Sequence, residues 1–121
     1  MGQVVLVAED DPSVRMTIEF VLNDEGFEVL LAEDGEQALS LALGSKPDVI
    51  LLDQIMPKMG GKEVLVALRA DDRTKDIPVL VLTGMARGEP SEWPGATFIG
   101  KPFSPDALVQ RIREVLGPKP G

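Results

Sequence analysis

The sequence predicts an α/β fold in which helices cover both faces of a parallel sheet. Two observations support this prediction: short runs of consecutive apolar residues, and intervening segments whose apolar residues repeat with helical spacing. Continuous runs rich in Val and Leu are typical of strands buried on both faces, as in parallel sheets. Because strands and helices alternate along the chain, right-handed crossovers would give a doubly wound five-stranded parallel sheet.

The strands are expected where the apolar runs lie. Four runs are clear and a fifth is short: Val4 to Ala8, Val29 to Ala32, Val49 to Leu52, Val79 to Leu82, and Thr97 to Ile99. The first four are continuous rather than alternating, which favours burial of both faces.

Three helices are expected between these strands. The first begins at Pro12, which suits a first helical turn, with Asp11 before it as the cap and Gly26 after it as the stop. The other two are shorter and span Gly35 to Leu43 and Lys62 to Ala70.

The last third of the chain is less regular. The segment from Gly84 to Ala96 contains two prolines and three glycines, and in a helix interior each Pro costs about 3 kcal/mol and each Gly about 1 kcal/mol relative to Ala. We therefore expect at most one helical turn there, with Trp93 folded back as cover. A final helix should follow, with Ser104 as its cap and Gly117 as its stop.

Composition limits the chemistry. The 121 residues suit one domain, expected over residues 1–117, with 118–121 as a frayed tail or the first residues of a linker. A formal charge of -8 disfavours direct contact with nucleic acid or anionic lipid, and with no apolar span or signal peptide we expect a cytoplasmic protein. Without Cys or His, the chain must use carboxylates, hydroxyls, lysine or a hard metal ion.

Polar residues follow several of the expected strands, where ligands of open parallel sheets bind. These residues are Glu9, Asp10, Asp11, Asp53, Thr83 and Lys101. Gathered carboxylates repel one another unless a cation lies between them, and oxygen ligands suit Mg²⁺. An ammonium and a hydroxyl beside the metal suit a tetrahedral dianion. The combination predicts a phosphoryl site.

Each residue alone has a simpler interpretation. Asp11 before Pro12 is expected to be a helix cap. Asp53 alone would be a turn residue, Thr83 a packed strand residue and Lys101 a solvated charge. Only their combination indicates a functional site.

Four motifs resemble those of the CheY-like family of response-regulator receiver domains. They are Val5 to Pro12 with Arg15, Leu51 to Asp53 with Met56 and Pro57, Val81 to Gly84, and Lys101 to Phe103. The resemblance covers essentially all 121 residues. It implies a flavodoxin-like (βα)5 fold with strand order 2-1-3-4-5. The interval from Thr83 to Lys101 is shorter than usual in the family by about one helical turn, which implies a shortened or irregular fourth helix.

The resemblance also implies a role for each acidic residue. Asp53 would accept a phosphoryl group from the phosphohistidine of a histidine kinase or histidine phosphotransfer protein. Asp10 would bind Mg²⁺ directly and Glu9 through water, with Asp53 and the backbone carbonyl of Ile55 as further ligands. The family's spacing to Asp53 favours Glu9 and Asp10 over Asp10 and Asp11 as the acidic pair.

The remaining implied roles concern the switch. Thr83 and Lys101 would contact the phosphoryl oxygens, and the peptide bond between Lys101 and Pro102 would be cis. Phosphorylation would draw in Thr83 and leave space that Phe98, the aromatic switch residue, can fill. The implied function is a phosphoacceptor of a two-component phosphorelay that signals through a conformational change. It would not be an enzyme, apart from slow self-dephosphorylation.

Other functions share parts of this pattern. A phosphorylation-independent receiver-like interaction module would be favoured if an acidic-pair residue, Thr83 or Lys101 were missing, and all are present. A Mg²⁺-dependent phosphohydrolase would need an acid/base carboxylate two residues after Asp53, where Ile55 stands. An FMN-binding protein shares the architecture, but the acidic loop after the first strand would repel a phosphate.

Overall fold

A five-stranded parallel sheet forms the centre of the computed structural model, which describes residues 3–54, 56, 58–83, 93, 95–100 and 103–117. The strands follow the order β2-β1-β3-β4-β5. They are β1 (Val4–Ala8), β2 (Glu28–Ala32), β3 (Val49–Asp53), β4 (Val79–Thr83) and β5 (Ala96–Gly100). The predicted fold class and strand order are confirmed, and no strand exceeds its expected limits by more than one residue at either end.

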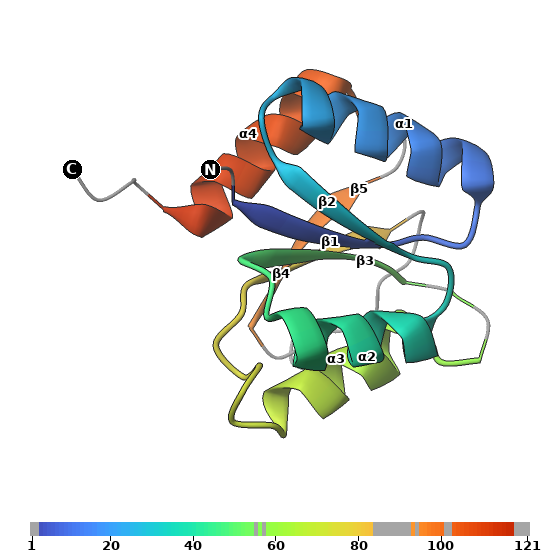
Figure 1. The fold of residues 1–121 in the computed structure, drawn as a ribbon, viewed down its shortest axis with the longest axis vertical. Helices are drawn as coiled ribbons and strands as arrows, with labels where there is room; N and C mark the ends of the chain where they lie inside the picture. The colour runs from blue at the N-terminus through green and yellow to red at the C-terminus, as the bar shows by residue number, and fades with distance from the viewer. Residues whose placement is uncertain are drawn as a thin grey trace.

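Helices cover both faces of this sheet, as Figure 1 shows. The helices α1 (Pro12–Asp24) and α4 (Pro105–Leu116) lie on one face, and α2 (Gly35–Ser45) and α3 (Gly61–Arg69) lie on the other. Each pair packs against its own hydrophobic cluster. Successive strand residues point to opposite faces, so each strand contributes apolar residues to both clusters.

The helix ends follow from local chemistry. The side chain of Asp11 accepts a hydrogen bond from the backbone N–H of Ser13 at 2.9 Å, and the hydroxyl of Ser104 accepts one from the backbone N–H of Ala107 at 3.1 Å. Both predicted N-caps are therefore confirmed. The helix α4 is followed by its C-cap Gly117, whose φ of 77° is in the region that favours glycine.

Two glycines allow close contacts around the loop that follows β3. A Cβ atom on Gly35, the first residue of α2, would lie 2.0 Å from the backbone oxygen of Met59. A Cβ atom on Gly61, the first residue of α3, would lie 2.4 Å from the backbone oxygen of Asp53. Only glycine fits at either position, so the ends of both helices pack tightly against this loop.

Between β4 and β5, residues 84–92 and Pro94 lie outside the described ranges, and so does most of the predicted irregular segment. Trp93 is buried and contacts the ring of Phe98 edge-on, with ring centroids 5.7 Å apart, so its expected role as cover is confirmed. The shortened or irregular helix predicted between β4 and β5 remains a prediction. Among the described helices, none is long and apolar enough to cross a membrane.

Candidate phosphoryl and metal site

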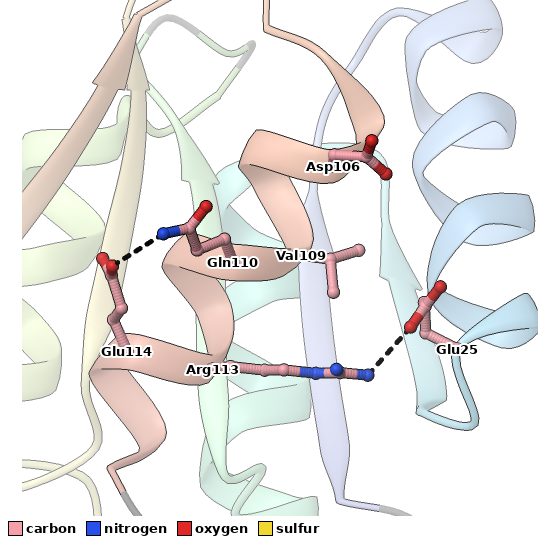
Figure 2. Close-up of a pocket in the computed structure, with 6 residues that line it drawn as sticks. All are labelled: Glu25, Asp106, Val109, Gln110, Arg113 and Glu114. Atoms are coloured by element: carbon pink, nitrogen blue, oxygen red, sulfur yellow. Dashed lines mark hydrogen bonds and ion pairs between the residues drawn. The ribbon is translucent and has the colours of Figure 1, made fainter.

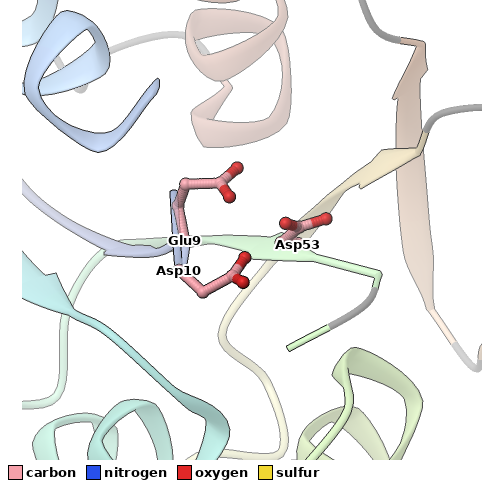
Figure 3. A group of neighbouring side chains, drawn as sticks. All are labelled: Glu9, Asp10 and Asp53. Atoms are coloured by element: carbon pink, nitrogen blue, oxygen red, sulfur yellow. The ribbon is translucent and has the colours of Figure 1, made fainter. Parts of the chain in front are cut away.

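Three carboxylates meet at the carboxyl end of the sheet, as Figure 3 shows. Glu9 and Asp10 directly follow β1, and Asp53 is the last residue of β3. One carboxylate oxygen from each residue lies within 4.8 Å of the other two. Glu9 and Asp53 are buried, whereas Asp10 is exposed. Parallel pairing of β1 with β3 brings the two strand ends together.

The backbone around the acidic pair is held by its neighbours. The guanidinium of Arg15 donates hydrogen bonds to the backbone oxygens of Glu9 at 2.8 Å and Asp10 at 3.4 Å. The backbone N–H of Asp11 donates to a carboxylate oxygen of Glu9 at 3.1 Å. Asp11 itself caps α1, so the acidic pair that meets Asp53 is Glu9 and Asp10.

The charges of this cluster determine what it can bind. Ionised carboxylates at these separations repel one another, and a cation placed between them removes that repulsion. Carboxylate oxygens are ligands that Mg²⁺ and Ca²⁺ prefer. The donor set therefore fits a hard divalent cation.

A buried hydroxyl lies at the end of the neighbouring strand. Thr83 ends β4, is 3% exposed, and donates a hydrogen bond to the side-chain oxygen of Gln54 at 2.8 Å. Sequence reasoning identified Thr83 but missed Gln54. The strand register would have identified Gln54. Asp53 pairs with Leu82, so the next residues, Gln54 and Thr83, lie level with each other.

The predicted aromatic switch residue lies one strand further along. Phe98 is half-buried in β5 and packs against the cluster beneath α2 and α3. It pairs with Val81, two residues before Thr83. Thr83 and Phe98 therefore lie on the same face of the sheet.

Three predicted site features fall outside the described residues. They are the backbone carbonyl of Ile55, the ammonium of Lys101 and the peptide bond before Pro102. Their roles remain predictions.

A shallow groove of about 510 Å³ lies elsewhere, between α4 and the turn after α1 (Figure 2). The guanidinium of Arg113 lies 2.8 Å from a carboxylate oxygen of Glu25 and 5.8 Å from the centre of the Phe27 ring. Exposed ion pairs of this kind contribute at most about 1 kcal/mol to stability. The groove shares no residue with the acidic cluster, and we interpret the contact between Arg113 and Glu25 as a link between α4 and the end of α1.

Comparison with known proteins agrees with this geometry. The family model described as the response regulator receiver domain matches residues 5–113. The phosphate regulon transcriptional regulatory protein PhoB from Pseudomonas aeruginosa is 38% identical over 122 residues, covering 96% of this chain and 52% of PhoB. PhoB from Escherichia coli has the same identity and coverage. The chain thus spans about half the length of these curated relatives.

Solved structures give the same assignment. The chemotaxis protein CheY4 of Vibrio cholerae superposes with a TM-score of 0.88 at 33% identity, covering 95% of this chain and 99% of CheY4. The receiver domain of the sensor histidine kinase PA1611 from Pseudomonas aeruginosa has a TM-score of 0.88 at 29% identity, covering 98% and 100% of the two chains, and holds a magnesium ion in its active-site cleft.

The fold and the acidic site define a phosphoacceptor module of two-component signalling, and the chain belongs to the response regulator receiver domain family. Receiver domains of this family bind Mg²⁺ in an acidic site and receive phosphoryl groups from histidine kinases.

Proposed function

We propose that Asp53 is the phosphoacceptor of this receiver domain and that its phosphorylation requires Mg²⁺. The observation that carries the proposal is the convergence of Glu9, Asp10 and Asp53 within 4.8 Å. Asp10 and Asp53 would hold the ion directly, Glu9 through water, and the backbone carbonyl of Ile55 would complete the protein ligands. The oxygen-only donor set favours Mg²⁺ over softer metals.

The donor in this proposal is the phosphohistidine of a histidine kinase or histidine phosphotransfer protein. A carboxylate oxygen of Asp53 forms a bond to phosphorus while the bond between phosphorus and the imidazole nitrogen breaks, and that nitrogen keeps the electron pair. The product is an acyl phosphate on Asp53. Catalysis of such a transfer consists mostly of alignment and charge stabilisation.

The chain's own residues supply both requirements. The pairing of β1 with β3 fixes Asp53 beside the acidic pair, and the hydroxyl of Thr83 and the ammonium of Lys101 would bind the phosphoryl oxygens. When bound, Mg²⁺ neutralises negative charge on the group in transfer. Slow self-dephosphorylation would reset the domain, which is not otherwise an enzyme in this proposal.

The output in this proposal is a conformational change in Thr83 and Phe98 that a partner protein recognises. A formal charge of -8 argues against direct contact between this segment and DNA, although the relatives named PhoB are transcriptional regulatory proteins. The proposal keeps the cytoplasmic location that the sequence predicts.

The test is incubation with acetyl phosphate and Mg²⁺ followed by intact-mass measurement. The wild-type protein should gain the mass of one phosphoryl group, and Asp53→Asn should gain none, because the substitution removes the nucleophilic oxygen. The matched control is Asp106→Asn, which replaces an exposed carboxylate in the first turn of α4. This variant should be phosphorylated as wild type is. Binding of beryllofluoride with Mg²⁺ gives a second measurement, which self-dephosphorylation does not affect. Phosphoryl uptake by Asp53→Asn, or equal uptake without Mg²⁺, would contradict the proposal.

A further inference from the structure

Asp53 and Thr83 end neighbouring strands, but their side chains belong to opposite faces of the sheet. In β3, Leu51 packs in the cluster beneath α1 and α4, so alternation directs Asp53 toward that face. In β4, Val81 packs in the cluster beneath α2 and α3, so Thr83 lies on that other face. The hydroxyl of Thr83 is therefore not directed at Asp53 by the strand geometry.

Gln54 lies on the same face as Thr83 and at the same level. Its side-chain oxygen accepts the hydroxyl hydrogen bond of Thr83 at 2.8 Å. The backbone of Gln54 is held on both sides: its N–H donates to the oxygen of Leu82 in β4, and its oxygen accepts from the N–H of Gly61 in α3, both at 3.1 Å. The amide of Gln54 therefore extends toward Thr83 from a fixed backbone position.

We propose that Gln54 is a positioning residue that holds the hydroxyl of Thr83 in the unphosphorylated protein and competes with the phosphoryl group for it. This inference rests on the proposed function of Asp53. A hydroxyl has one proton to donate, so Thr83 cannot donate fully to Gln54 and to a phosphoryl oxygen at once. The charged phosphoryl oxygen is the stronger acceptor, and phosphorylation transfers the hydrogen bond to it.

The strength of the Thr83–Gln54 hydrogen bond sets the size of the effect. The net contribution of a neutral hydrogen bond corresponds to roughly a twofold to tenfold change in an equilibrium constant. The affinity of the site for a phosphoryl group is lowered by this factor, because the hydrogen bond must break first. Gln54 thus restrains premature switching and sets the threshold of the response.

The test uses Gln54→Met, which keeps the length of the side chain and removes the acceptor. Beryllofluoride with Mg²⁺ serves as the phosphoryl analogue, and its affinity is measured by titration. Gln54→Met should bind it roughly twofold to tenfold more tightly than wild type. Gln110→Met, on the exposed surface of α4, is the matched control and should bind it as wild type does.

A second substitution, Thr83→Val, removes the hydroxyl with little change of shape. In the Thr83→Val background, Gln54→Met should leave the affinity for beryllofluoride unchanged, because there is no hydroxyl to release. A purely structural role for Gln54 would not produce this dependence. The proposed competition is wrong if Gln54→Met binds beryllofluoride no more tightly than wild type. It is also wrong if Gln54→Met tightens binding equally in the Thr83→Val background.

Unfolding of the unliganded protein separates the two proposals. The double-mutant cycle of Gln54→Met and Thr83→Val should show a coupling of roughly twofold to tenfold in the unfolding equilibrium constant. Absence of coupling would overturn the hydrogen bond itself. If wild type neither binds beryllofluoride nor accepts a phosphoryl group, the proposed function fails and the competition fails with it, whereas measured coupling would still establish the contact.

Discussion

Replacing Asp10 and Asp11 by alanine, one at a time, should separate metal binding from helix capping. The two aspartates are adjacent, but only Asp10 belongs to the cluster with Glu9 and Asp53. The side chain of Asp11 instead accepts a hydrogen bond from the backbone N–H of Ser13 at 2.9 Å. Asp11→Ala should therefore lower the stability and keep the response to Mg²⁺. Asp10→Ala should lose most of the response to Mg²⁺ and keep the helix cap.

The magnitudes follow from these contacts. Asp11→Ala removes a helix N-cap and should cost about 1 kcal/mol of unfolding free energy, with or without Mg²⁺. Binding of Mg²⁺ at 100 times its dissociation constant should stabilise wild type by about 2.7 kcal/mol. If loss of Asp10 weakens binding about 100-fold, the same concentration stabilises Asp10→Ala by only about 0.4 kcal/mol.

Urea unfolding followed by circular dichroism measures the unfolding free energy of wild type and of both variants, in Mg²⁺ and in a chelator. Asp11→Ala should keep the full difference between the two conditions and lose stability in both. Asp10→Ala should lose most of the difference while keeping its helix cap. Equal loss of the Mg²⁺ response in both variants would refute the assignment of Glu9 and Asp10 as the acidic pair.

Three other measurements test the fold and the switch. Gly35→Ala should destabilise the protein by about 1 to 3 kcal/mol in urea unfolding because its Cβ would lie 2.0 Å from a backbone oxygen. Gly44→Ala in the same helix meets nothing within 4 Å and should stabilise it by about 0.5 to 1 kcal/mol; equal effects would contradict the close approach. The emission of Trp93, the single tryptophan, should change on binding beryllofluoride, because the proposed movement of Phe98 would alter the contact between the two rings; emission unchanged on binding would argue against the switch. Side-chain hydrogen bonding with the guanidinium two residues later lowers the pKa of Asp71 from 3.8 to about 2. A lowered pKa contributes stability that is present above pH 3.8 and lost as pH falls toward 2, so Asp71→Asn should lose less stability than wild type across that range, and identical acid unfolding curves would contradict this.

Much of the fold was predictable because the relevant forces are local or repetitive. The residues from Val49 to Leu52 are apolar because both faces of β3 are covered, and that pattern is visible in the sequence. Asp11 and Ser104 predicted helix starts because capping requires only a side-chain oxygen and the next few N–H groups. The acidic cluster was predictable because parallel strands bring their carboxyl ends to one edge.

Other contacts depend on register and packing between distant segments. The hydrogen bond between Gln54 and Thr83 spans 29 positions and requires knowledge of which residues lie level on β3 and β4. The close approach of Gly35 to Met59 depends on how α2 meets the loop after β3. A glycine at a helix start indicates nothing by itself about such a neighbour.

The division of the core into two clusters bears on how this domain can diverge. Leu51, two residues before Asp53, packs in the layer beneath α1 and α4, whereas Phe98 and Val81, two residues before Thr83, pack in the layer beneath α2 and α3. The sheet separates these layers, so substitutions in one have little steric effect on the other. Given the roles proposed above, substitutions beneath α1 and α4 would act on the phosphoacceptor alone, whereas substitutions beneath α2 and α3 would act on both the affinity for the phosphoryl group and the conformational response, so selection can alter the phosphoacceptor without altering the switch.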